Sequence, residues 1–257
     1  MKTRDIKSLL EEKYAFFNAP EFIPSDPVAI PHLFSKREDI EISGFLVATI
    51  AWGQRNTIVK NGHRLMNLMD QAPHDFVLHA GPDDLRRLTS FVHRTFNGDD
   101  CLFFIESLRN IYTNGNGLEE AFSAGIKAQE HHIFHAILNF RETFLKSPHL
   151  PRSVKHIANP AAGSTAKRLN MFLRWMVRDD HKGVDFGIWK SLSPAQLYCP
   201  LDVHVGHIAR KIGLLQRKQN DWLAVEELTA NLRSFDADDP VKYDFALFGM
   251  GVSEKIK

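Results

Sequence analysis

The sequence is poor in cysteine, with only Cys101 and Cys199 in 257 residues. A disulfide-stapled scaffold, a four-cysteine iron–sulfur cluster and a four-cysteine zinc site each need more thiols than this. His131, His132 and His135 place two imidazoles at helical spacing, but no acidic residue follows at the spacing of a zinc-protease helix. We therefore expect no metal and no cofactor.

Long apolar runs are also missing. The longest, residues 42–52, is interrupted by Ser43, Gly44 and Thr49, and a bilayer-spanning helix takes about 20 apolar residues. Residues 1–5 do not lead into an apolar core that ends at a small-residue cleavage site. We expect a cytoplasmic protein that makes no contact with a membrane.

Neither sign of charge dominates the chain, whose formal net charge is +1. Any affinity for nucleic acid must then come from Lys and Arg that cluster locally. Sustained period-two alternation is absent, whereas apolar residues recur at helical spacing in most segments. Because the chain has 44% hydrophobic residues and 19 Phe, it can bury a large core. We predict an all-α fold.

Proline and glycine mark the expected breaks between helices. Residues 20–31 carry four prolines, which predicts an extended connection from an N-terminal helix to a helix beginning near Ser35 or Lys36. Turn-forming residues divide the middle of the chain into shorter helices at four further places: 80–82, 97–98, 114–117 and 147–151. No internal repeat or low-complexity tract is present, so a single unit is expected.

Residues 159–164, Asn-Pro-Ala-Ala-Gly-Ser, predict a tight turn between two helices. A short helix is expected before it, over residues 152–158, and Ser164 is expected to cap the helix that follows. Two interpretations of the turn stay open. The backbone N–H groups of Ala162, Gly163 and Ser164 could bind a phosphate, or the segment could be an ordinary connection.

The helix after this turn has two contrasting faces. Leu169 and Phe172 lie on an apolar face, while Lys167, Arg174 and Arg178 form a basic stripe on the opposite one. The stripe is either a solvated surface or a contact surface for phosphates.

A second polar residue that stands out is Asp202, in Cys-Pro-Leu-Asp-Val-His-Val at residues 199–205. It can cap a helix that ends at Gly213, and a cap alone would account for an aspartate there.

Four segments resemble the helix-hairpin-helix DNA glycosylase superfamily. Residues 200–214 resemble its catalytic-aspartate segment, and residues 45–56 resemble the glutamine-bearing helix end that faces DNA. Residues 166–174 are similar to the lysine segment of archaeal oxoguanine glycosylase/lyases, in which the lysine stands five residues before Phe-Leu-Arg. Residues 243–251 complete the resemblance, which spans about 43–252. The whole chain also resembles an uncharacterised family of bacterial hypothetical proteins.

This resemblance implies a two-lobed glycosylase fold over residues 1–257. Residues 36–193 would form a helical barrel lobe that contains the hairpin, and residues 1–35 with 194–257 would form a second helical lobe. Lys167 and Asp202 would lie in the cleft between the lobes.

The implied activity is excision of an oxidised purine such as 8-oxoguanine from double-stranded DNA, followed by strand nicking. Lys167 would form a Schiff base with the sugar, and Asp202 would assist proton transfer and stabilise the sugar cation. Gln54 would fill the gap left by the flipped base. The expected DNA contacts are Gln54, Arg55, Ala162, Gly163, Ser164, Arg174, Arg178 and His204. We expect a monomer, associated with the nucleoid when it acts.

Two other functions remain open. The hairpin departs from the usual Gly-x-Lys, and the charge is near neutral, so the chain could be a DNA-binding protein that has kept the fold without catalysis. It could also be a glycosylase for alkylated bases without lyase activity, in which Asp202 activates water and Lys167 contacts a phosphate. Gln54 could equally be an ordinary exposed polar residue.

Overall fold

The computed structural model describes residues 3–126 and 132–253, and these residues are mostly helical. Their two strands are short: β1 (Val92–His93) and β2 (Phe96–Asn97) pair as an antiparallel hairpin. The prediction of an all-α fold is confirmed at this level. Within the described ranges, no helix combines the length and the apolar character needed to cross a membrane.

The chain divides into two compact units. The middle unit comprises residues 23–126 and 135–158, and the terminal unit comprises residues 1–22, 127–134 and 159–257. This division differs from the boundaries at 36 and 193 predicted from the sequence. The segment 159–193, which carries the predicted hairpin and the helix after it, groups with the two chain ends.

Phenylalanines form the core of the middle unit. Phe45, Phe104 and Phe144 pack against one another with ring centroids 4.9–5.8 Å apart, and Phe122 stacks on Phe140 at 3.9 Å. Such pairs add to the free energy gained from burying the rings. The helices that supply this unit are α2 (Arg37–Thr49), α3 (Arg55–Leu68), α4 (Pro73–His79), α5 (Pro82–Leu88), α6 (Gly98–Asn114), α7 (Leu118–Ser123) and most of α8 (Phe134–Phe144).

The expected breaks fall between these elements, and α2 begins at Arg37, next to the expected Lys36. The prediction of an extended proline segment over 20–31 is wrong. The segment forms three 3-10 turns at Pro20–Ser25, Pro27–Ala29 and Pro31–Leu33, because a proline φ also suits the first position of a helical turn. The short helix expected over 152–158 is likewise a 3-10 turn, Pro151–His156.

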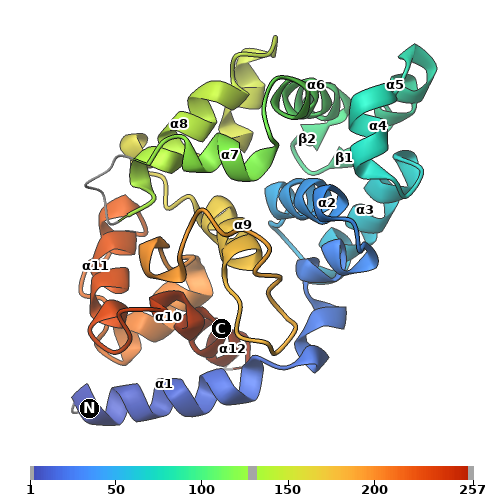
Figure 1. The fold of residues 1–257 in the computed structure, drawn as a ribbon. Coiled ribbons are helices and arrows are strands. Elements are labelled where there is room, and N and C mark those ends of the chain that lie inside the picture. Colours follow the sequence, from blue (N-terminus) through green and yellow to red (C-terminus); the bar gives the residue numbers. More distant parts are fainter. Residues whose placement is uncertain (1–2, 127–131, 254–257) are drawn as a thin grey trace. The chain divides into compact units, whose positions relative to one another are not determined.

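In the terminal unit, the apolar helix α12 (Tyr243–Ser253) lies against both α1 (Thr3–Phe17) and α10 (Val203–Lys211) (Figure 1). A helix that is apolar nearly all round needs neighbours on more than one side. Gly249 allows the approach of α1, since a Cβ there would stand 2.3 Å from the Phe17 ring. The unit also contains α9 (Lys167–Val177) and α11 (Trp222–Arg233).

A substitution at Gly98, the first residue of α6, tests the packing of the middle unit. A Cβ at this position would stand 2.5 Å from the backbone Cα and O of Thr89. We expect Gly98→Ser to lower the free energy of unfolding by about 1–3 kcal/mol through overpacking. Gly81→Ser is the matched control, because a Cβ there meets only Asp84, at 3.8 Å. Equal thermal unfolding midpoints for the two variants would contradict this packing.

Candidate functional site

A tight turn precedes α9, as the sequence predicts. Pro160–Ala162 forms a 3-10 turn that ends at Gly163, whose φ of 85° is one that glycine adopts without strain. The Gly163 carbonyl accepts a hydrogen bond from the Trp222 N–H at 3.1 Å, which ties the turn to the start of α11. Ala162 and Gly163 are exposed.

The turn uses its own N–H groups, and this corrects the predicted phosphate contact. Ala162 and Ser164 donate to the Asn159 carbonyl at 3.1 and 3.2 Å, and Gly163 donates to the Pro160 carbonyl at 2.9 Å. Ser164 does not cap α9 either, since its Oγ accepts from the Ala166 N–H at 3.2 Å. The three N–H groups are engaged because the turn closes on itself within residues 159–164.

The helix α9 begins at Lys167, directly after Ala166 in the left-handed conformation. Ala166 has φ 47° and is 1% exposed. A non-glycine residue held in this region costs about 1 kcal/mol or more, and such residues cluster at functional sites. The backbone reversal at Ala166 fixes the position of Lys167 in the first turn of the helix.

Lys167 and Asp202 lie together in the terminal unit. The Lys167 Nζ is 3.8 Å from the Asp202 Oδ2, and about a fifth of each side chain is exposed. Asp202 is the N-cap of α10, and its Oδ1 accepts from the Val205 N–H at 2.9 Å. The two carboxylate oxygens therefore have separate tasks: one caps the helix and the other faces the lysine.

The lysine amine also has apolar and aromatic neighbours. Its Nζ lies 3.5 Å from the Met171 sulfur and 6.0 Å from the centre of the Phe248 ring. His204 places its ring 6.3 Å from Phe248, with its Nδ1 3.3 Å from the Gly251 carbonyl. His204 is half-buried on α10, beside the pair.

A second carboxyl, that of Asp244 on α12, belongs to the surroundings of this pair. Its Oδ2 accepts a hydrogen bond from the Arg174 Nη1. Burial raises the pKa of Asp244 to about 6, while the positive charges of Arg174 and Lys167 act against this rise and the negative charge of Asp202 adds to it. The charges of Lys167 and Asp202 therefore both act on the Asp244 carboxyl.

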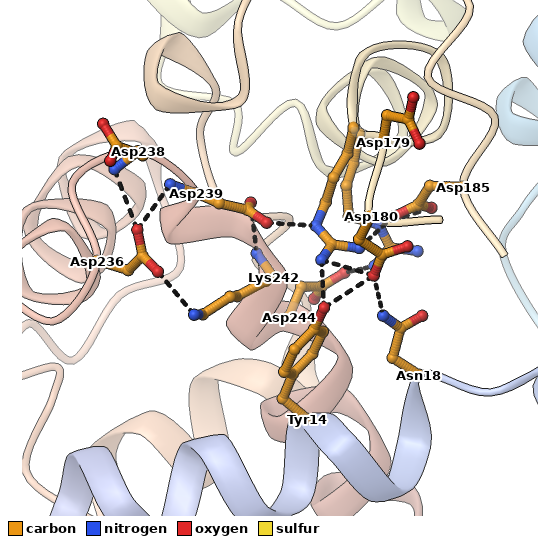
Figure 2. A network of polar contacts seen from close by, with 12 residues as sticks. Tyr14, Asn18, Asp179, Asp180, Asp185, Asp236, Asp238, Asp239, Lys242 and Asp244 are labelled. Carbon is orange, nitrogen blue, oxygen red and sulfur yellow. Dashed lines mark hydrogen bonds and ion pairs between the residues drawn. The ribbon is translucent and has the colours of Figure 1, made fainter. Parts of the chain in front are cut away.

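The predicted basic stripe on α9 is wrong for two of its three members. Arg174 is 4% exposed and Arg178 is 1% exposed, so neither presents a guanidinium to a phosphate. Both guanidinium groups are buried, and aspartates form ion pairs with them in the interior. Figure 2 shows this network, which links Asp180, Asp185, Asp239 and Asp244 with Tyr14 of α1.

The ion pairs and hydrogen bonds of this network are short. Arg178 reaches Asp239 at 2.8 Å, Asp180 at 2.9 Å and Asp185 at 3.2 Å, and it donates to the Tyr14 hydroxyl at 2.7 Å. Arg174 shares Asp185 at 3.3 Å and lies 4.1 Å from the centre of the Phe245 ring. A guanidinium offers five donors, so it can serve several carboxylates at once.

The carboxyls differ in their titration. Burial would raise the pKa of Asp180, but the Arg178 charge and the Tyr14 hydroxyl outweigh it and lower this pKa to about 2. Burial raises the pKa of Asp185, against the charges of Arg174 and Arg178. It also raises the pKa of Asp239, against Arg178.

Gln54 and Arg55 belong to the middle unit. Gln54 is the exposed N-cap residue of α3, and its side chain makes no capping hydrogen bond. Arg55 is the first residue of that helix and is half-buried.

Three histidines stand at positions 131, 132 and 135. Among the residues that the structure describes, no group of three His, Cys, Asp or Glu side chains could hold an ion. His131 lies outside the described residues, while His132 and His135 lie within them.

Sequence reasoning assigned no role to Asp244 or to Phe248, although both lie in the segment 243–251 that carried part of the resemblance. A lone charge within Tyr-Asp-Phe-Ala-Leu-Phe was a usable signal. An aspartate in an otherwise apolar helix is almost never fully buried without a partner.

The chain belongs to the family described as protein of unknown function (DUF2400), whose model matches residues 26–253. No curated protein and no solved structure matches it.

Arg178→Gln tests the buried network. We expect this change to lower the free energy of unfolding by about 3–5 kcal/mol at neutral pH, because it leaves carboxylates buried without their cation. Folding lowers the pKa of Asp180 from its ordinary value of 3.8 to about 2, so the ionised carboxylate stabilises the fold at pH values above 3.8. This stabilisation is lost as the pH falls to about 2. The deficit of the variant should therefore shrink in acid, as measured by denaturant unfolding at several pH values.

The exposed pair of Arg86 and Asp83, at 3.4 Å, supplies the control. Arg86→Gln should change the stability by about 1 kcal/mol or less, as is usual for surface pairs. Arg178→Gln with an equally small effect would contradict the network.

Proposed function

We propose that this protein is a DNA glycosylase with AP lyase activity, built on the two-lobed helix-hairpin-helix glycosylase fold. The observation that carries the proposal is the 3.8 Å approach of the Lys167 amine to the Asp202 carboxylate. The lysine opens a helix directly after a glycine-containing turn, and the aspartate caps another helix. The proposed substrate is double-stranded DNA that carries an oxidised purine such as 8-oxoguanine.

The pair supplies the groups that the reaction needs. The Lys167 amine attacks the sugar C1′, the bond from C1′ to the base breaks, and the base leaves with the electron pair of that bond. The sugar ring then opens as the C1′–O4′ bond breaks and O4′ takes the proton released by the amine, which leaves an iminium between Nζ and C1′. Loss of a C2′ proton and departure of the 3′-phosphate by β-elimination nick the strand. The Asp202 Oδ2 faces the region in which positive charge develops on the sugar, and a fixed carboxylate stabilises that charge.

Contact with the DNA backbone is proposed at the start of α9. The N–H groups of a first helical turn have no intrahelical acceptors, and the helix dipole favours an anion there. Ala162 and Gly163, in the turn that precedes this helix, are exposed. Gln54, exposed at the start of α3 in the middle unit, is proposed to occupy the space of the flipped nucleotide.

Asp202 also favours a second candidate, a glycosylase for alkylated bases without lyase activity. One of its oxygens is committed to capping, and the other could activate a water molecule. In that case Lys167 would only contact a phosphate. A DNA-binding protein without catalysis is the remaining alternative.

Borohydride trapping on duplexes with 8-oxoguanine or an abasic site separates these functions. We expect wild-type protein to form a covalent complex that Lys167→Ala abolishes, because the adduct is an imine on that amine. Asp202→Asn should slow base release by about 10²–10⁴-fold. Lys211→Ala, an exposed lysine at the end of α10, is the control and should trap normally.

The other outcomes select among the alternatives. Base release that persists in Lys167→Ala without trapping would favour the enzyme that acts through water. No release and no trapping on any damaged duplex, with duplex affinity retained, would favour the binding protein.

Gln54→Ala tests the gap-filling role. We expect it to slow excision from duplex DNA by about tenfold, because the flipped state costs a few kcal/mol unless the gap is filled. Excision from single-stranded DNA should not change, since no gap forms there. Asn67→Ala, at the other end of α3, is the control. Equal losses on both substrates would refute the role, and single-turnover kinetics would measure them.

A further inference from the structure

Residues 217–222, which lead from α10 into α11, contact both of the segments that hold the lysine–aspartate pair. The Trp222 N–H donates to the Gly163 carbonyl at 3.1 Å, in the turn before α9. The Asn220 Nδ2 donates to the Asp202 carbonyl at 3.3 Å, at the start of α10. One short segment therefore joins the turn before α9 to the cap of α10.

An arginine of α10 holds this segment in place. The Arg210 guanidinium donates to the Arg217 carbonyl at 2.8 Å and to the Asn220 Oδ1 at 2.7 Å. Arg217 in turn pairs with Asp221 at 2.5 Å, and Asp221 is the N-cap of α11. Because the amide oxygen of Asn220 accepts from a guanidinium, which has no acceptor, the Nδ2 is the atom left to face the Asp202 carbonyl.

The approach of Asn220 to α10 depends on a glycine at position 206. A Cβ there would stand 2.7 Å from the Arg210 Nη1 and 2.9 Å from the Asn220 Oδ1. Gly206 lies within α10, and glycine is less favourable than alanine in a helix interior. Helix stability alone would favour alanine at this position, whereas the place of the Asn220 amide requires glycine.

The two hydrogen bonds act on the backbone that carries each functional group. Gly163 lies in the turn directly before the helix that Lys167 opens, and Asp202 carries the carboxylate itself. Packing between the helices contributes little to their relation, because α10 packs chiefly against α12 and not against α9. The contacts of 217–222 therefore restrain the 3.8 Å separation of Nζ and Oδ2.

We propose that Asn220 is a positioning residue of the Lys167–Asp202 site, and that the segment 217–222 sets the separation of the two groups. This inference rests on the proposed glycosylase function and deepens it. Asn220 acts through the Asp202 backbone carbonyl and takes no part in the making or breaking of bonds. A displacement of reacting groups by about 1 Å can slow a reaction by up to about 10²-fold.

Gly206→Ala separates positioning from stability, because the two effects have opposite signs. The added Cβ displaces the ends of two flexible side chains, Asn220 and Arg210, while alanine favours the helix. The thermal unfolding midpoint should equal or exceed that of wild-type protein. Single-turnover base release at saturating duplex should nevertheless be slower by about tenfold, with unchanged affinity for the duplex. A wild-type rate in this variant would overturn the proposal.

Asn220→Ala removes the amide without adding an atom, so it tests the same role if Gly206→Ala disturbs the fold. It should also slow base release by about tenfold at unchanged duplex affinity. Asn231→Ala is the matched control, because the Asn231 Nδ2 likewise donates to a backbone carbonyl of the terminal unit, that of Leu214, at 2.7 Å. The control should release the base at the wild-type rate. Equal rates in Asn220→Ala and Asn231→Ala would overturn the proposal.

Amide hydrogen exchange tests the role of the segment without any DNA. The Val205 N–H is bound by the cap of α10, and the Trp222 N–H is bound by the turn before α9. Asn220→Ala should speed the exchange of both, since it loosens the link between the two helix starts, and Asn231→Ala should leave both unchanged. Wild-type exchange in Asn220→Ala would overturn the proposal. If exchange changes but wild-type protein releases no damaged base, the restraint by 217–222 stands and the glycosylase function fails.

Discussion

The arrangement of the terminal unit depends on two arginines that are buried with the aspartates around them. A guanidinium at 4% or 1% exposure is stable only when carboxylates replace the water it has lost. Arg178 joins α9 to Asp180 and Asp185 in the loop that follows it, to Asp239 before α12 and to Tyr14 of α1. Arg174 extends the same network to Asp244. Because these contacts are directional, they fix the rotation of α9 about its axis and hence the side on which Lys167 emerges.

The same network separates what the sequence could predict from what it could not. Helical periodicity, the turn at Gly163 and the cap at Asp202 are local properties, and all three were predictable. The burial of Arg174 and Arg178 was not predictable, because their partners lie up to 164 residues away in the chain. Spacing alone cannot distinguish a stripe that faces solvent from one that faces buried aspartates. The prolines of 20–31 illustrate a second limit, since a fixed φ suits both an extended segment and a 3-10 turn.

The resemblance to glycosylases predicts that Lys167 and Asp202 share one site, although 35 residues separate them in the chain. Their 3.8 Å approach is a property of the terminal unit alone. Its local causes are the left-handed Ala166 before Lys167 and the helix cap that holds Asp202. The engaged N–H groups of 162–164 move the proposed phosphate contact from the turn itself to the first turn of α9. The site is therefore best described as a helix start, a helix cap and a buried charge network beneath them.

The most direct test of this description is a crystal structure of the borohydride-reduced complex between the protein and a duplex with an abasic site. We predict a covalent bond from the Lys167 Nζ to the sugar C1′, with the Asp202 carboxylate beside it. Arg174 and Arg178 should remain in their ion pairs, with no phosphate contact. An adduct on another residue, or either arginine turned toward the DNA backbone, would contradict the account.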